Sequence, residues 1–119
     1  MTRRVDKPWG FEEIWAETDQ YVGKVLVLNR GSRLSLRAHR VKEETLYVES
    51  GRIRCLVGGS EDSMAESILG PGETIHIPPG MLHRFEALED TRMFEVSTPH
   101  LDDVERLSDD FGREGTSKP

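Results

Sequence analysis

Cysteine is almost absent from the chain, since Cys55 is the only one among 119 residues. A lone cysteine cannot form a disulfide within the chain, and its β-prone surroundings favour a small apolar core residue over a reactive thiol. Long apolar runs are also missing, because no stretch approaches the ~20 residues that span a bilayer. The first six residues lack the apolar core of a signal peptide. We therefore expect a cytoplasmic protein with no membrane partner.

Basic residues are outnumbered: 22 acidic side chains against 16 basic ones give a formal net charge of -6. This balance argues against non-specific binding to nucleic acid or to anionic membranes. Lysine is scarce, because only Lys7, Lys24, Lys42 and Lys118 occur. The other basic residues are arginines, so a local arginine cluster can still bind a phosphorylated small molecule.

Extended helical periodicity is missing from most of the chain. Short β-prone runs are instead separated by glycine, proline or acidic turns, at the spacing of roughly 8–12 residues that is typical of a barrel or sandwich. The expected strands are 10–16, 21–28, 34–39, 45–49, 52–57, 74–77, 83–88 and 93–97. The segment 58–63 reads as an exposed loop. We predict one domain over residues 1–119, with a barrel core at about 10–98.

The tail from 99 to 119 has a different character. Pro99 suits the first turn of a helix, with Thr98 as its cap. Leu101, Val104 and Leu107 lie at helical spacing, although the acidic pairs among them suit an irregular segment equally well. The expectation is therefore a short helical or irregular tail.

Three side chains of metal-ligand type stand out, namely His39, Glu44 and His83. His39 and Glu44 are close in sequence, at the end of one strand and the start of the next. His83 follows the turn at 78–80, which returns the chain to the barrel wall. Two imidazoles and one carboxylate suit Zn, Fe, Mn or Ni and leave coordination positions open for substrate oxygens.

The turn residues around these ligands resemble the two motifs of the cupin superfamily. The matching positions are Gly31, His39, Glu44 and Gly51 in the first motif, and Gly72, Pro78, Gly80 and His83 in the second. Arg37 stands where the first motif has a histidine, and Ala87 replaces the asparagine of the second. The resemblance implies an all-β, single-domain jelly-roll barrel (a double-stranded β-helix) with one divalent metal per chain on the triad. Zinc is expected first, with Mn, Fe or Ni as alternatives.

A narrower resemblance, to the cupin domain of type II mannose-6-phosphate isomerases, covers almost the whole chain. It rests on the segments 7–10, 34–36, 76–80 and 83–84 and on the tail elements 102–106 and 111–113. The resemblance implies interconversion of mannose 6-phosphate and fructose 6-phosphate, or a related hexose isomerisation or epimerisation. The nucleotidyltransferase half of the bifunctional proteins is absent from the sequence, so we expect a stand-alone cupin. In that family a glutamine at the position of Arg37 joins the metal shell, whereas arginine stays protonated and cannot ligate a metal.

Such a reaction needs a cationic clamp for the phosphate and a base. Arg37 is two residues from His39 and is expected on the same face of the strand. Arg84, Arg106 and Arg113 are the further clamp candidates. The base stays open: His76 and Tyr47 are our first candidates, followed by Glu49 and His100.

Two other functions remain open from the sequence. One is a non-haem metal dioxygenase, because small cupins with two histidines and a carboxylate also activate oxygen. The other is a non-catalytic module that binds a sugar or a metal, since a fold alone does not determine function. A homodimer is expected in each case, with the segment from Trp9 to Trp15 as the candidate contact.

Overall fold

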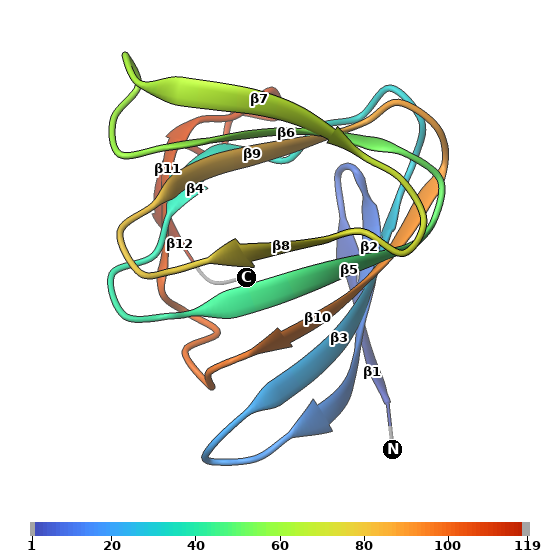
Figure 1. Ribbon diagram of the computed structural model, residues 1–119. Coiled ribbons are helices and arrows are strands. Elements are labelled where there is room, and N and C mark those ends of the chain that lie inside the picture. Colours follow the sequence, from blue (N-terminus) through green and yellow to red (C-terminus); the bar gives the residue numbers. More distant parts are fainter. Residues whose placement is uncertain (1, 118–119) are drawn as a thin grey trace.

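The computed structural model describes residues 2–117, with side chains described up to residue 115, and within them the chain forms two six-stranded antiparallel sheets. The first sheet has the order β1 (Arg3–Lys7), β2 (Gly10–Glu17), β3 (Val22–Leu28), β10 (Thr91–Ser97), β5 (Glu44–Ser50), β8 (Thr74–Ile77). The second has the order β12 (Gly115–Ser117), β11 (Val104–Ser108), β4 (Leu36–Ala38), β9 (Leu82–Ala87), β6 (Ile53–Gly58), β7 (Met64–Leu69). Figure 1 shows the sheets facing each other as the two walls of a barrel. The expected all-β jelly roll is confirmed.

The core lies between the sheets and follows the period-2 alternation of the strands. In β5, Leu46 and Val48 point inward and are fully buried, whereas Tyr47 between them is exposed. The inward set continues with Leu26, Leu28, Leu34, Ile53, Ile77, Phe85 and Met93. Cys55 belongs to the same cluster, and burial raises the pKa of its thiol to about 12, which makes it unreactive.

A tight turn at residues 8–9 connects β1 to β2 and sets the position of Trp9. Gly10 has φ +149°, and any Cβ there would collide with the carbonyl oxygen of Val27. The close approach lets the Trp9 carbonyl accept a hydrogen bond from the Asn29 amide at 2.9 Å. Trp9 is thereby held in the core at 1% exposure, which makes it a core residue and not a surface contact.

The tail forms strands where the sequence predicted a short helical or irregular segment. Residues 104–108 form β11, which pairs with β4, and Gly115–Ser117 form β12 beside it, so the sheets extend beyond the predicted core of 10–98 (Figure 1). The helical interpretation is wrong because it counted Leu107 as inward-facing, whereas that side chain is 40% exposed. The buried residues of β11 are Val104 and Arg106, which alternate with period 2.

Two edge strands were also missed, for a related reason. β1 and β7 are largely exposed on both faces, so no alternation of apolar and polar residues marks them in the sequence. Across residues 2–117 we found no helix that is long and apolar enough to cross a membrane.

Candidate metal centre and its pocket

His39, Glu44 and His83 meet inside the barrel, at the ends of three different segments. His39 follows β4 and His83 lies in the neighbouring strand β9, whereas Glu44 begins β5 in the facing sheet. All three are at most 4% exposed. Glu44 Oε1 lies 3.6 Å from His39 Nε2 and 3.3 Å from His83 Nε2, and the three ligand atoms lie within 4.8 Å of one another. This arrangement can hold one metal ion.

The hydrogen bonds of both imidazoles leave one nitrogen of each ring free to bind a metal. His83 Nδ1 donates to the Met81 carbonyl at 3.0 Å, and His39 Nδ1 donates to the Asp103 carbonyl. Because a carbonyl only accepts, each Nδ1 carries the proton and each Nε2 keeps its lone pair facing Glu44. Backbone carbonyls orient metal-bound histidines in this manner. The donor set therefore fits a divalent ion.

Asp103 was not singled out for this position by the sequence. Its carboxylate accepts hydrogen bonds from three consecutive amides, of Arg40, Val41 and Lys42, at 3.1, 2.7 and 3.0 Å. Burial raises the pKa of Asp103, but these bonds outweigh it and lower the pKa overall. Asp103 thus fixes the loop between His39 and Glu44, and it links the metal centre to the tail.

Glu44 stays ionised because of its neighbours. Burial alone would raise its pKa, but the positive charge of Lys42 holds it well below the ordinary value. Lys42 Nζ lies 3.1 Å from Oε2 of Glu44, the oxygen that does not face the imidazoles. One carboxylate oxygen is therefore left for a metal.

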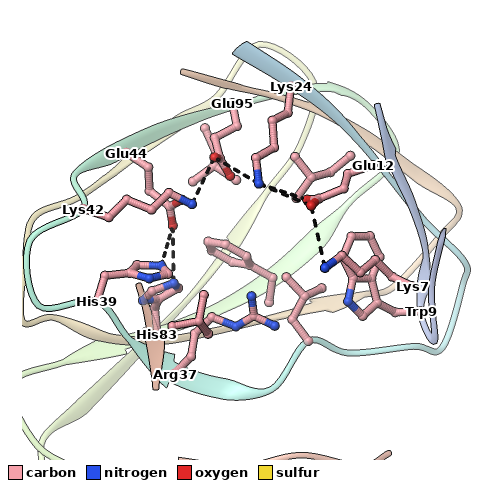
Figure 2. Close-up of a pocket in the computed structure, with 15 residues that line it drawn as sticks. Lys7, Trp9, Glu12, Lys24, Arg37, His39, Lys42, Glu44, His83 and Glu95 are labelled. Atoms are coloured by element: carbon pink, nitrogen blue, oxygen red, sulfur yellow. Dashed lines mark hydrogen bonds and ion pairs between the residues drawn. The ribbon is translucent and has the colours of Figure 1, made fainter. Parts of the chain in front are cut away.

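A row of buried ion pairs continues from this point around the inner wall of the first sheet (Figure 2). Lys42 and Lys24 lie 3.3 and 3.9 Å from Glu95, and Lys24 and Lys7 lie 3.2 and 3.7 Å from Glu12. Alternating signs make such burial tolerable, since an unpaired charge would be far more costly. The sequence signal for this row is Lys24, a lysine inside the apolar run 22–28.

The buried ionisable groups of this row differ in the direction in which their pKa values are shifted. Burial lowers the pKa of Lys7 to about 8, with Glu12 opposing the change only in part. Glu12 has a lowered pKa, because Lys24 and Lys7 outweigh the effect of its burial. Burial and the neighbouring Glu44 carboxylate raise the pKa of Glu95. Lys7 therefore loses its proton more readily than an ordinary lysine.

Arg37 lies on the same wall as the histidines, as its spacing from His39 predicted. Its Nε donates to Ser35 Oγ at 2.9 Å, and its Nη2 is buried without an acceptor among the described residues. Burial and the nearby Arg106 lower the pKa of Arg37 to about 10, so it stays cationic at neutral pH.

The two first candidates for the base lie outside the barrel, which corrects the expectation that they are catalytic. Ile75 and Ile77 pack inward, so His76 faces solvent and pairs with Glu43 at 2.5 Å. Tyr47 is also exposed and stacks on Phe94 with ring centroids 6.0 Å apart. Of the reserve candidates, Glu49 and His100 are exposed as well.

Two of the expected clamp residues also lie away from the pocket wall. Arg84 follows His83 in β9 and so points outward, where it donates to the carbonyls of Leu34 and Ser108 at 2.8 and 3.2 Å. It joins the tail to the barrel. Arg113 donates two hydrogen bonds to Asp109, at 2.9 and 3.2 Å. These pairings correct the assignment of Arg84 and Arg113 to substrate binding.

The cavity between these residues is small. Its free space is about 30 Å³, and its wall includes Lys7, Lys24, Lys42 and Arg37 against Glu12, Glu44 and Glu95. Four cations against three carboxylates leave one positive charge before any metal binds. The space suits a metal ion or a water molecule, whereas a sugar needs several times more room. A larger ligand therefore requires the residues around the mouth to move.

Comparison with known proteins agrees with this architecture. The profile of the family described as "Cupin domain" matches residues 24–97. The mannose-1-phosphate guanylyltransferase ManC of Salmonella typhimurium is 30% identical over 118 residues. That match covers 95% of this chain but 24% of the relative, so the chain spans about a quarter of the length of ManC.

Solved structures with the same fold have lower identity. KdgF from Halomonas sp. has a TM-score of 0.73 at 22% identity, covering 84% of this chain and 88% of KdgF. Oxalate decarboxylase from Bacillus subtilis has a TM-score of 0.76 at 17% identity, covering 89% of this chain and 30% of the enzyme. At such identities the two likenesses support the fold alone.

Proposed function

We propose that this chain, which belongs to the cupin family, is a metal-dependent isomerase of an anionic hexose, of the mannose 6-phosphate/fructose 6-phosphate type. The observation that carries the proposal is the pair of imidazoles whose Nε2 lone pairs face one carboxylate oxygen, beside a buried arginine with an unused donor. The similarity to a mannose-1-phosphate guanylyltransferase supports a sugar phosphate as the substrate class.

In this proposal His39, Glu44 and His83 hold one divalent ion, with zinc as the first expectation. The bound ion would supply an electrophile for the sugar oxygens and so stabilise the negative charge of an enediolate. Lys42 keeps the Glu44 carboxylate ionised and oriented. Arg37 offers a fixed positive charge to an anionic substrate.

Aldose–ketose isomerisation also moves a proton between C2 and C1, and Lys7 is our candidate for the group that carries it. Its Nζ lines the cavity, 3.7 Å from the nearest carboxylate oxygen, that of Glu12. With a pKa of about 8, part of the Lys7 population is neutral near pH 7–8 and can accept a proton from C2. The resulting ammonium can return that proton to C1.

We also infer a homodimer that packs through the outer face of the first sheet. Trp15, Tyr47, Phe94 and Val96, on β2, β5 and β10, are between 36% and 57% exposed. Grouped exposure of large apolar side chains on one sheet face is typical of an interaction surface. This replaces the sequence expectation that Trp9 takes part, because Trp9 is buried.

The experiment that tests the function is metal analysis together with a turnover assay. Zinc at one per chain, with conversion of mannose 6-phosphate to fructose 6-phosphate, would support the isomerase. Iron with oxygen uptake would support a dioxygenase instead, and bound metal without turnover of either kind would support a binding module. Arg37→Gln should retain the metal, since Arg37 cannot be a ligand.

A further inference from the structure

Four N–H donor atoms are buried in the barrel interior without any acceptor among the described residues. They are Nε1 of Trp9, Nη2 of Arg37, and Nε and Nη1 of Arg106. Trp9 and Arg106 are 1% and 3% exposed, so water does not cover them. Nearly all buried polar groups in proteins are hydrogen-bonded, so a group of unused donors indicates a missing acceptor.

The four donors come from three distant parts of the chain, and Arg37 connects the other two residues. Arg106 on β11 lies directly opposite Arg37 on β4 in the antiparallel ladder, so both side chains leave the sheet on the same face. Arg37 and Trp9 both line the cavity. In Figure 2 the Arg37 guanidinium reaches from β4 toward the side of the pocket that holds Trp9 and Lys7.

The neighbouring carboxylates accept no hydrogen bond from these four donors, and Asp109, Glu12 and Glu44 are each paired with another cation. Asp109 accepts two hydrogen bonds from Arg113. Glu12 accepts from Lys24 at 3.2 and 3.3 Å. Glu44 is held by Lys42 and faces the histidines.

The charges of the two arginines also favour an anion here. Arg37 and Arg106 lie opposite each other on β4 and β11, and the charge of Arg106 adds to burial in lowering the pKa of Arg37. Two buried guanidinium groups repel each other, and an anion between them would remove that repulsion.

We propose that Arg37, Arg106 and Trp9 form a subsite for the oxyanion group of the ligand, and that a phosphate monoester is the group that fits it. A phosphate at neutral pH has three terminal oxygens that only accept, and it matches guanidinium donors well. The inference deepens the proposed function, on which it rests for the sugar part of the ligand. The strand that supplies Arg106 begins next to Asp103, which contacts His39. The tail therefore contributes residues to both the metal centre and the anion subsite.

The test is calorimetric titration of chelator-treated protein, which separates anion binding from metal binding and from turnover. The probes are inorganic phosphate, mannose 6-phosphate, mannose and glucuronate, at constant ionic strength. Arg106→Gln should weaken the binding of phosphate and mannose 6-phosphate at least ~10-fold, because hydrogen bonds to a charged group are lost. Arg92→Gln, which removes an exposed arginine from the outer face of β10, should leave both affinities unchanged.

Thermal unfolding shows whether Arg106 is merely structural. Removing a buried, unpaired cation should leave the Tm of the anion-free protein unchanged or higher, while abolishing the rise in Tm that phosphate produces. A lower Tm with phosphate binding intact would overturn the proposal. If Arg106→Gln does not fold, Arg106→Lys keeps the charge but loses the fork of donors, and unchanged phosphate affinity in that variant would overturn the proposal as well.

The remaining outcomes separate the subsite from the proposed function. Phosphate binding that depends on Arg106, without isomerase turnover, would keep the subsite and refute the isomerase. The subsite would be refuted if Arg106→Gln turned over substrate with an unchanged KM. It would also be refuted if the wild-type protein bound neither phosphate nor mannose 6-phosphate. Glucuronate binding more tightly than mannose 6-phosphate would overturn the choice of phosphate in favour of a carboxylate.

Discussion

Lys7 should make the folded protein less stable at neutral pH than it is at high pH. Its pKa is about 8 in the folded protein against an ordinary 10.5, because burial disfavours the ammonium form. Each pKa unit corresponds to ~1.4 kcal/mol, so burying the charged form costs on the order of 3 kcal/mol below pH 8. The side chain is 7% exposed, so solvent screening removes little of this cost.

The sign of the pH dependence follows from which state binds more protons. Between pH 8 and 10.5 the unfolded chain keeps the Lys7 proton and the folded protein loses it, so the free energy of unfolding rises with pH. Below pH 8 both states are protonated and the full cost remains. Above 10.5 both are neutral and the cost vanishes.

Lys7→Met isolates this contribution from other groups that titrate at high pH. Urea unfolding of wild type and variant, in the presence of a chelator, should give the variant an advantage of up to about 3 kcal/mol at pH 7. The advantage should shrink steadily to pH 10.5. Lys24→Met is the contrasting change, because it leaves Glu12 and Glu95 short of their partner and should destabilise by ~3–5 kcal/mol.

This reasoning would be refuted if wild type and Lys7→Met differed in free energy of unfolding by the same amount at pH 7 and pH 10.5. It would mean that Lys7 reaches solvent and titrates normally. Lys7 would then also be unsuited to carry a proton near neutral pH.

Three further changes test other parts of the site and surface. Asp103→Asn should weaken zinc affinity ~10–100-fold, measured by competition with a chelating dye, because the loop between two ligands loses its anchor. His76→Ala should leave both zinc affinity and isomerase kinetics unchanged, and a loss of either would return His76 to the catalytic candidates. Phe94→Glu should shift a dimer to a monomer in light scattering behind a sizing column, since it places a charge in the exposed apolar face; an unchanged mass would refute that interface.

The fold and the triad could be predicted because turn residues determine them. Glycines and prolines mark where strands end, and His39 and Glu44 are only five residues apart around one bend. Period-2 alternation then places Arg37 on the face of His39. Local spacing supports these two steps, whereas the grouping of His83 with the other ligands came from the resemblance to the second cupin motif.

The remaining wall of the pocket could not be predicted, because it depends on which face of each strand is buried. His76 sits between two isoleucines, and either face of that strand could have pointed inward from the sequence alone. In β11 Arg106 is buried beside Val104 while Leu107 is exposed, which for the arginine and the leucine is the reverse of the usual pattern. Such reversals are tolerated where buried charges find partners or ligands, and this barrel interior is one such place.

Zinc titration into chelator-treated protein tests whether His39, Glu44 and His83 hold a metal ion. One ion should bind per chain in the wild type and in Arg37→Gln, and that binding should be lost in Glu44→Gln, whose side chain keeps its shape but loses its charge. Protein that binds none of Zn, Mn, Fe or Ni, or Glu44→Gln that binds zinc as tightly as the wild type, would contradict this prediction.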